Sequence, residues 1–127
     1  MREITVNEQV YPLTFGMDFL RELNKRRGLQ MQGTDKIVGG LINTITFIET
    51  MGDPEAVLDL LEAALVTEKK RPDKKSLEAW LFEQEDIEGL LADFLEQLRT
   101  IPVLKFALNR SLETAQKEQM RQFVQEN

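Results

Sequence analysis

Apolar and polar residues alternate over the first fifteen positions of the chain. Ile4 and Val6 alternate with polar neighbours, and so do Tyr11 and Leu13 after the polar run "NEQ". Alternation with a period of two is typical of half-buried strands, and a short polar break between two such runs indicates a hairpin. We therefore expect residues 1–15 to form a β-hairpin that turns within this polar run. Because an isolated hairpin is marginally stable in water, it should pack on helices or pair with another strand.

From Gly16 onward, the apolar period lengthens to that of a helix. Apolar residues recur every three or four positions in successive segments, which predicts short amphipathic helices separated by turns. We therefore expect a mostly α-helical fold, in which a small N-terminal β-hairpin packs on a bundle of about five to six short amphipathic helices. The apolar stripes are formed by Phe19, Leu20 and Leu23; by Ile37, Val38, Leu41, Ile42, Ile45 and Ile48; by Val57, Leu60, Leu61, Ala64 and Leu65; by Leu77, Trp80 and Leu81; by Leu90, Leu91, Phe94, Leu95 and Leu98; and by Leu104, Leu108, Leu112 and Ala115.

Three aspartates stand where helices should begin: Asp53, Asp73 and Asp86. Aspartate is a favourable N-cap because its carboxylate accepts hydrogen bonds from the free N–H groups of the first helical turn. The proline after Asp53 fits the first helical position, and the proline before Asp73 ends the preceding helix. We expect one helix to start after each of these aspartates.

Glycines mark the helix ends that are harder to place. Gly28 follows a last turn rich in lysine and arginine, so we expect it to close the first helix in the left-handed conformation. The segment "LQMQGTDK" that follows should be a loop. Gly39 and Gly40 lie inside the next apolar stripe, where glycine weakens a helix. Three interpretations stay open: the glycines permit close packing of helices, they mark a kink, or the helix starts late.

The apolar stripe fades towards the C-terminus, and this divides the chain. We expect residues 1–112 to form a single helical domain and residues 113–127 to form a helical or frayed C-terminal tail. Within that tail, Met120 and Phe123 are isolated apolar residues. They belong either to a frayed helix end or to a segment that orders against another chain.

The residue types on which much catalysis and metal binding depends are absent. The 127 residues include no cysteine and no histidine, which excludes thiol catalysis, thiolate metal sites and histidine-based sites within this chain. In "GLQMQGTDK" the lysine does not directly follow the second glycine, as it must in a phosphate loop. A calcium loop that starts at Asp86 would place Leu90 and Ala92 where oxygen ligands are needed. We expect no catalytic residues, no cofactor and no metal.

The overall charge bears on location and partners. The net charge of −6 and the pI of about 4.8 have the wrong sign for a general nucleic-acid-binding protein. The polar N-terminus lacks the apolar core of a signal peptide, and no apolar run approaches the ~20 residues that span a bilayer. We expect a soluble cytoplasmic protein that binds neither nucleic acid nor a membrane.

A basic run, "EKKRPDKKS", interrupts this acidic sequence at residues 68–76. It can be a connector between two helices, a site for an acidic partner, or a nucleic-acid contact, and the capping pattern favours the connector. Lys74 and Lys75 do not fit that explanation, because they place positive charge at the positive end of a helix. If the chain binds a partner through isolated residues, we expect Lys74, Lys75, Met120 and Phe123 to contribute.

The order of these elements resembles that of the tail assembly chaperones of long-tailed phages and prophages of Gram-positive bacteria. The resemblance runs from about Ile4 to about Leu108, and the residues beyond Ser111 do not align. The stretches that match best are "FG" at 15–16, "GDP" at 52–54, "TEK" at 67–69 with "RP" at 71–72, and "EDIE" at 85–88.

This resemblance implies a chaperone that is not an enzyme. Members of the family bind the long, aggregation-prone and largely helical tape measure protein, and keep it competent while tail tube subunits polymerise around it. They are absent from the mature virion, are often also made in a longer frameshifted form, and typically self-associate. The resemblance therefore implies a protein of the bacterial host's cytoplasm that binds the tape measure protein, copies of itself and, as an additional partner, the tail tube protein.

The composition leaves one alternative function open. A small acidic adaptor that binds a basic or DNA-binding protein has the same size and charge. Such an adaptor belongs to a regulatory class of protein rather than to tail assembly.

Overall fold

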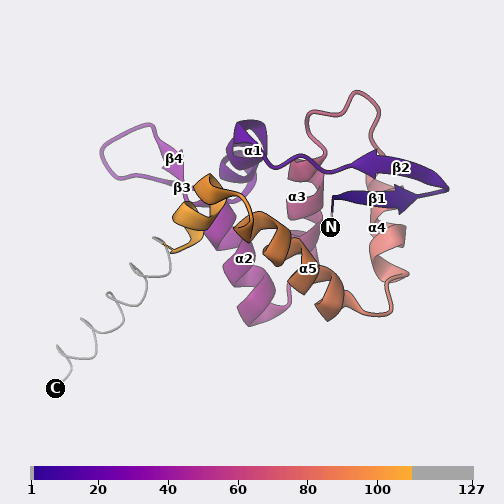
Figure 1. The fold of residues 1–127 in the computed structure, drawn as a ribbon. Coiled ribbons are helices and arrows are strands. Elements are labelled where there is room, and N and C mark those ends of the chain that lie inside the picture. Colours follow the sequence, from indigo (N-terminus) through magenta and orange to yellow (C-terminus); the bar gives the residue numbers. More distant parts are fainter. Residues whose placement is uncertain (1, 110–127) are drawn as a thin grey trace, which may run out of the picture.

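The computed structural model describes residues 2–109 and confirms a mostly helical fold with a small N-terminal hairpin (Figure 1). Residues 102–109 are helical, so Pro102 starts a further helix after α5, at a position where proline is favoured. The labelled elements are β1 (Glu3–Val6), β2 (Gln9–Pro12), α1 (Met17–Arg27), β3 (Leu29–Gln30), β4 (Ile37–Val38), α2 (Gly40–Met51), α3 (Pro54–Ala64), α4 (Lys74–Phe82) and α5 (Ile87–Arg99).

The N-terminal hairpin is part of the core. β1 and β2 pair antiparallel, and the two residues between them, Asn7 and Glu8, both have positive φ, as a tight hairpin turn requires. The alternation predicted from the sequence places Ile4 and Val6 on the buried face. Asn7 Nδ2 donates a hydrogen bond to Ser76 Oγ at 3.2 Å, which ties the turn to α4. The hairpin therefore packs on helices, as expected.

Helix α3 is the centre of the helical part. It lies between α2 and α4 in Figure 1 and packs against α1 and α2. The ring of Phe15 lies edge-on to Phe19 of α1 and to Phe94 of α5, with centroid distances of 5.3 and 5.2 Å. These three rings connect the start of the chain, α1 and α5 in one core. The buried residues of α3 are Ala56, Val57, Leu58, Leu60, Leu61, Ala63 and Ala64.

The three predicted N-caps are present. Asp53 accepts a hydrogen bond from the N–H of Glu55 at 3.0 Å, Asp73 from that of Ser76 at 2.7 Å, and Asp86 from that of Gly89 at 3.0 Å. Each carboxylate satisfies an N–H group of a first turn that has no partner within its helix. The starts of α3, α4 and α5 are therefore fixed by local sequence.

Two expectations for the segment between α1 and α2 are wrong. "LQMQGTDK" is not simply a loop, because Leu29–Gln30 pairs antiparallel with Ile37–Val38 to form the β3–β4 hairpin. Ile37 and Val38 therefore do not belong to the apolar stripe of α2, and both are exposed. The side chains of apolar residues just before a helix extend its periodicity in the sequence, whether or not the backbone is helical.

Gly28 does not adopt the left-handed conformation expected of it. Its φ of −76° and ψ of 163° are extended, and they lead the chain directly into β3. Glycine is needed there for space instead, because a Cβ would meet the carbonyl oxygen of Asn24 and the side chain of Ile37.

Gly39 and Gly40 combine two of the three roles left open by the sequence. Gly39 is the left-handed N-cap residue of α2, with φ of 80°, so the helix starts late. Gly40 permits close packing, since a Cβ there would overlap the backbone of Leu23 and Asn24 in α1. The Asn24 side chain then accepts a hydrogen bond from the Gly40 N–H at 2.9 Å. A residue of α1 thus takes the place of the side-chain cap that Gly39 lacks.

We predict that Gly40→Ala destabilises the protein, because the added methyl group forces the α1 and α2 backbones apart. Overpacking of this kind costs about 1–3 kcal/mol in the free energy of unfolding, measurable by urea denaturation. Gly16→Ala is the matched control, since a Cβ at Gly16 meets nothing within 4 Å. Equal stabilities of the two variants would contradict the close approach of α1 to α2.

We also predict that acid weakens the start of α4. The backbone and side-chain hydrogen bonds with Ser76 lower the pKa of Asp73 below its ordinary 3.8, and the nearby charge of Lys75 lowers it further. Because the folded pKa is the lower one, the contribution of the cap is complete above pH 3.8 and is lost as the pH falls through the folded value.

A pH titration of the carboxyl carbon of Asp73 by NMR measures this shift directly. The amide signal of Ser76, whose N–H donates to Asp73, should shift with the same pKa in the wild type. In Asp73→Asn this pH-dependent shift should be lost. An Asp73 carboxyl that titrates at or above 3.8 would contradict the cap.

Candidate partner-binding groove

The two lysines singled out in the sequence lie at the start of α4. Lys74 and Lys75 are exposed, and Lys75 contributes to the ionised state of the Asp73 cap. The positive charge of Lys75 thus faces a carboxylate at the helix start as well as the helix dipole. Lys74 borders a small hollow of about 130 Å³ between α4 and the end of α1. Their binding to a partner stays a prediction.

The other two predicted contact residues, Met120 and Phe123, lie outside the described residues. Of the four predicted contact residues, the structure therefore places Lys74 and Lys75, and the contribution of Met120 and Phe123 stays a prediction.

A larger apolar cavity lies elsewhere, where two pairs of consecutive helices meet. Its volume is about 510 Å³, and its walls are the end of α2, the start of α3, the end of α4 and the start of α5. We call this cavity the groove. It is lined by Ile48, Glu49, Gly52, Pro54, Val57, Leu81, Phe82, Gln84, Ile87, Glu88 and Leu91.

Two short connections shape the groove. Gly52 ends α2 in the left-handed conformation, with φ of 59°, and its N–H donates to the Ile48 carbonyl at 3.0 Å. Asp53 then caps α3 immediately. On the opposite side, α4 ends at Phe82 and α5 begins after the Asp86 cap. Because each connection is so short, the ends and starts of all four helices face one shared space.

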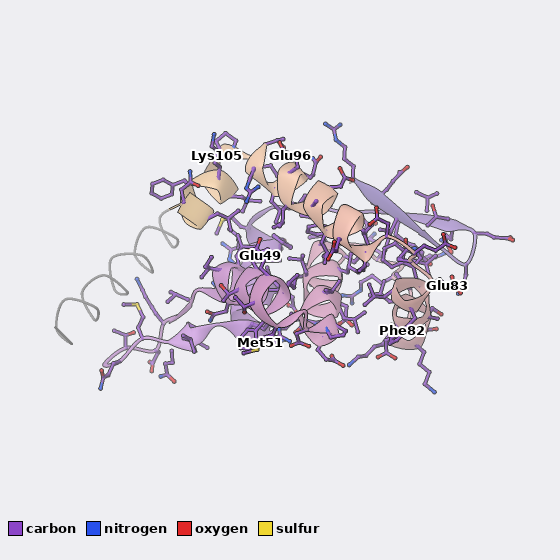
Figure 2. The ribbon with its side chains drawn as sticks, turned by 90° about the horizontal axis from the view of Figure 1, so that it is seen from below. Glu49, Met51, Phe82, Glu83, Glu96 and Lys105 are labelled. Carbon is purple, nitrogen blue, oxygen red and sulfur yellow. The ribbon has the colours of Figure 1, made fainter. Side chains whose placement is uncertain are left out.

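Large apolar side chains are exposed beside this space. Phe82, the last residue of α4, lines the groove with 84% of its surface exposed, and Met51, the last residue of α2, is 71% exposed. Figure 2 shows them on α4 and α2, on either side of α3. A phenylalanine this exposed contributes little to the core, so its apolar surface is available to another molecule.

Sequence reasoning missed the groove. Val57, Leu81 and Leu91 were assigned to apolar stripes, but nothing in the sequence shows that these stripes adjoin. One signal was available: Phe82 follows Leu81 directly and so lies off the buried side of α4. Trp80, which the sequence placed in an apolar stripe, is half-buried and packs against the core.

The β3–β4 hairpin presents a second apolar surface. Leu29, Met31, Ile37 and Val38 are all exposed on it, and Figure 1 shows it projecting from the helices. It is formed by two strands of two residues each, whereas the groove is a cavity whose walls come from four helices. The groove is therefore the better-formed candidate site.

The side chains at the groove present a surface suited to an apolar partner. Within residues 2–109, no three acidic side chains converge in a way that could hold a metal ion. Nor does this part of the chain have a helix of the length and apolar character needed to cross a membrane. What the groove offers is apolar surface bordered by the carboxylates of Glu49 and Glu88.

Comparison with protein-family models matches residues 3–112 to the family described as "Phage tail assembly chaperone protein, TAC". Comparisons with curated proteins and with solved structures found no match. The matched range includes every labelled helix and strand, and all the residues that line the groove.

Proposed function

We propose that this chain, which belongs to the family of phage tail assembly chaperones, binds the tape measure protein and keeps it soluble while the tail tube polymerises. One observation carries this proposal: an apolar groove between four helix ends, with Phe82 almost fully exposed on its wall. Grooves of this kind bind the apolar face of an amphipathic helix. A largely helical, aggregation-prone protein offers many such faces.

The proposal assigns no catalytic step to the chain and no cofactor. It acts by covering apolar surface of its partner until tube subunits replace it. On this account it works in the cytoplasm of the host cell, is absent from the mature virion, and meets the tail tube protein as an additional partner. Residues 1–112 form the binding domain, and residues 113–127 are a tail attached to it.

We also propose self-association, for which the β3–β4 hairpin is the supporting feature. Exposed apolar side chains on a short two-stranded hairpin favour pairing with another chain. Leu29 and Ile37 are 66% and 47% exposed on this hairpin. This surface is separate from the residues that line the groove, so a copy bound there leaves the groove open.

The test is co-expression with the tape measure protein of the same phage. We predict that Met51→Ser/Phe82→Ser reduces the soluble tape measure protein recovered in complex by roughly tenfold or more, as expected when exposed anchors of an interface are removed. The variant itself should remain folded, because substitution of exposed residues usually changes stability by no more than about 0.5 kcal/mol.

Met17→Ser/Phe106→Ser is the matched control. It removes the same two residue types, which are 54% and 61% exposed, from positions outside the groove. Recovery equal to wild type is expected for this control. If the tape measure protein is equally insoluble with and without the wild-type chain, the proposed function is wrong; if both double variants behave like wild type, the groove is not the site.

A further inference from the structure

The basic residues of the chain avoid the groove. No lysine or arginine occurs between residues 37 and 68 or between residues 76 and 98. These two segments contain α2, α3, most of α4 and nearly all of α5, and therefore every residue that lines the groove. All charged groups contributed by these segments are carboxylates.

Part of this negative charge is neutralised on the side of α3 that faces α1. Arg26 Nη1 contacts Glu62 at 2.6 Å and Arg27 Nε contacts Asp59 at 2.6 Å. Arg27 also reaches Asp53 at 3.4 Å. The acids of α3 that face α1 are therefore paired within the protein.

The acids at the groove are not paired in this way. None of the ion pairs found within residues 2–109 involves Glu49 or Glu88, which line the groove, or Glu83, which follows Phe82. Figure 2 shows Glu49 on α2 and Glu83 at the end of α4. The groove thus combines an apolar floor with carboxylates on more than one wall.

The two lysines of the basic run that belong to α4 lie a full helix length from the groove wall at Phe82. Lys74 and Lys75 begin this helix and Phe82 ends it. Seven to eight residues of helix separate them, or about 10–12 Å of rise. This exceeds the Debye length of about 8 Å at physiological ionic strength, so the two charged regions are largely independent.

The elements that form the walls of the groove favour a helix as its occupant. An extended peptide that binds as a β-strand pairs its backbone with the edge of a sheet. The lining residues, however, belong only to helices and their connections, and the β1–β2 and β3–β4 hairpins contribute none of them. A helix satisfies its own backbone hydrogen bonds, so it can enter an apolar groove without burying unpaired N–H and C=O groups.

We infer that the groove binds an amphipathic helix whose apolar face is flanked by lysine or arginine residues. The apolar face fills the space beside Val57, Leu81 and Leu91, and the flanking cations lie opposite Glu49 and Glu88. The inference rests on the proposed function, and specifies which helices of a tape measure protein the chaperone selects. Helices of the same apolar pattern with acidic flanks are rejected, because like charges face each other.

Two synthetic helical peptides test this selection. Both carry leucines at positions i, i+3, i+4 and i+7, and they differ only in having lysines or glutamates at the flanking positions. Binding to the full chain is measured by fluorescence anisotropy at low and at high salt. We expect the lysine peptide to bind at least roughly tenfold more tightly at low salt, with the difference reduced at high salt.

Charge-reversal variants distinguish the effect of the groove carboxylates on peptide binding from the effect of the protein's net charge. Glu49→Lys/Glu88→Lys should weaken the lysine peptide by roughly tenfold and strengthen the glutamate peptide. Glu3→Lys/Asp35→Lys changes the net charge equally at exposed positions outside the groove, and should alter binding by less than about twofold. Equal effects of the two double variants would overturn the inference, and so would equal binding of the two peptides to wild type.

A measurement on the unmodified chain makes the test independent of variant folding. The methyl NMR signals of Val57, Leu81 and Leu91 should shift when the lysine peptide is added, and unchanged signals overturn the inference. The proposed function has its own readout in co-expression. If that assay succeeds while neither peptide binds, the charge selection is wrong and the chaperone function stands.

Discussion

The burial of α3 is the constraint from which most of the architecture follows. A helix with seven of its eleven residues buried must be covered on several sides. Two acids of this helix, Asp59 and Glu62, lie towards α1, which supplies Arg26 and Arg27 as their partners. Burial by itself would lower the pKa of Arg26, but hydrogen bonds from its guanidinium to Glu22, Glu62 and Asp59 raise it above the ordinary value. The elements that pack on α3 are therefore held by apolar contacts and by ion pairs.

In this fold, the residues that stabilise the core differ from the apolar residues that are exposed to other molecules. The buried sides of α2, α4 and α5 face the core, whereas Met51 and Phe82 come at the last residues of two helices and point away from it. A protein that exposes such side chains risks associating with other apolar surfaces. The net charge of −6, to which Glu49 and Glu83 beside those side chains contribute, opposes unspecific contact between copies.

Local features of this fold were predictable from the sequence, and features that depend on contacts between distant residues were not. The alternation of Ile4 and Val6 and the aspartate caps act within a few residues, so pattern reasoning recovered the hairpin and the starts of three helices. The cap that Asn24 of α1 provides to Gly40 of α2 joins two elements, and no pattern in the sequence predicts it. The groove is a further non-local feature, since its walls come from segments up to 43 residues apart, from Ile48 to Leu91.

The position of the exposed anchors has an evolutionary consequence. Glu49, Met51 and Phe82 are exposed and are not core residues, so substitutions there leave the covering of α3 unaltered. Under the proposed function, the same substitutions would alter what binds at and beside the groove. Partner preference can then diverge between phages while the scaffold stays the same. Under the proposed function, one or two surface substitutions in the chaperone would match a tape measure protein that gains or loses cations beside an apolar face. In such a protein, adaptation to a new partner and retention of the fold draw on different residues.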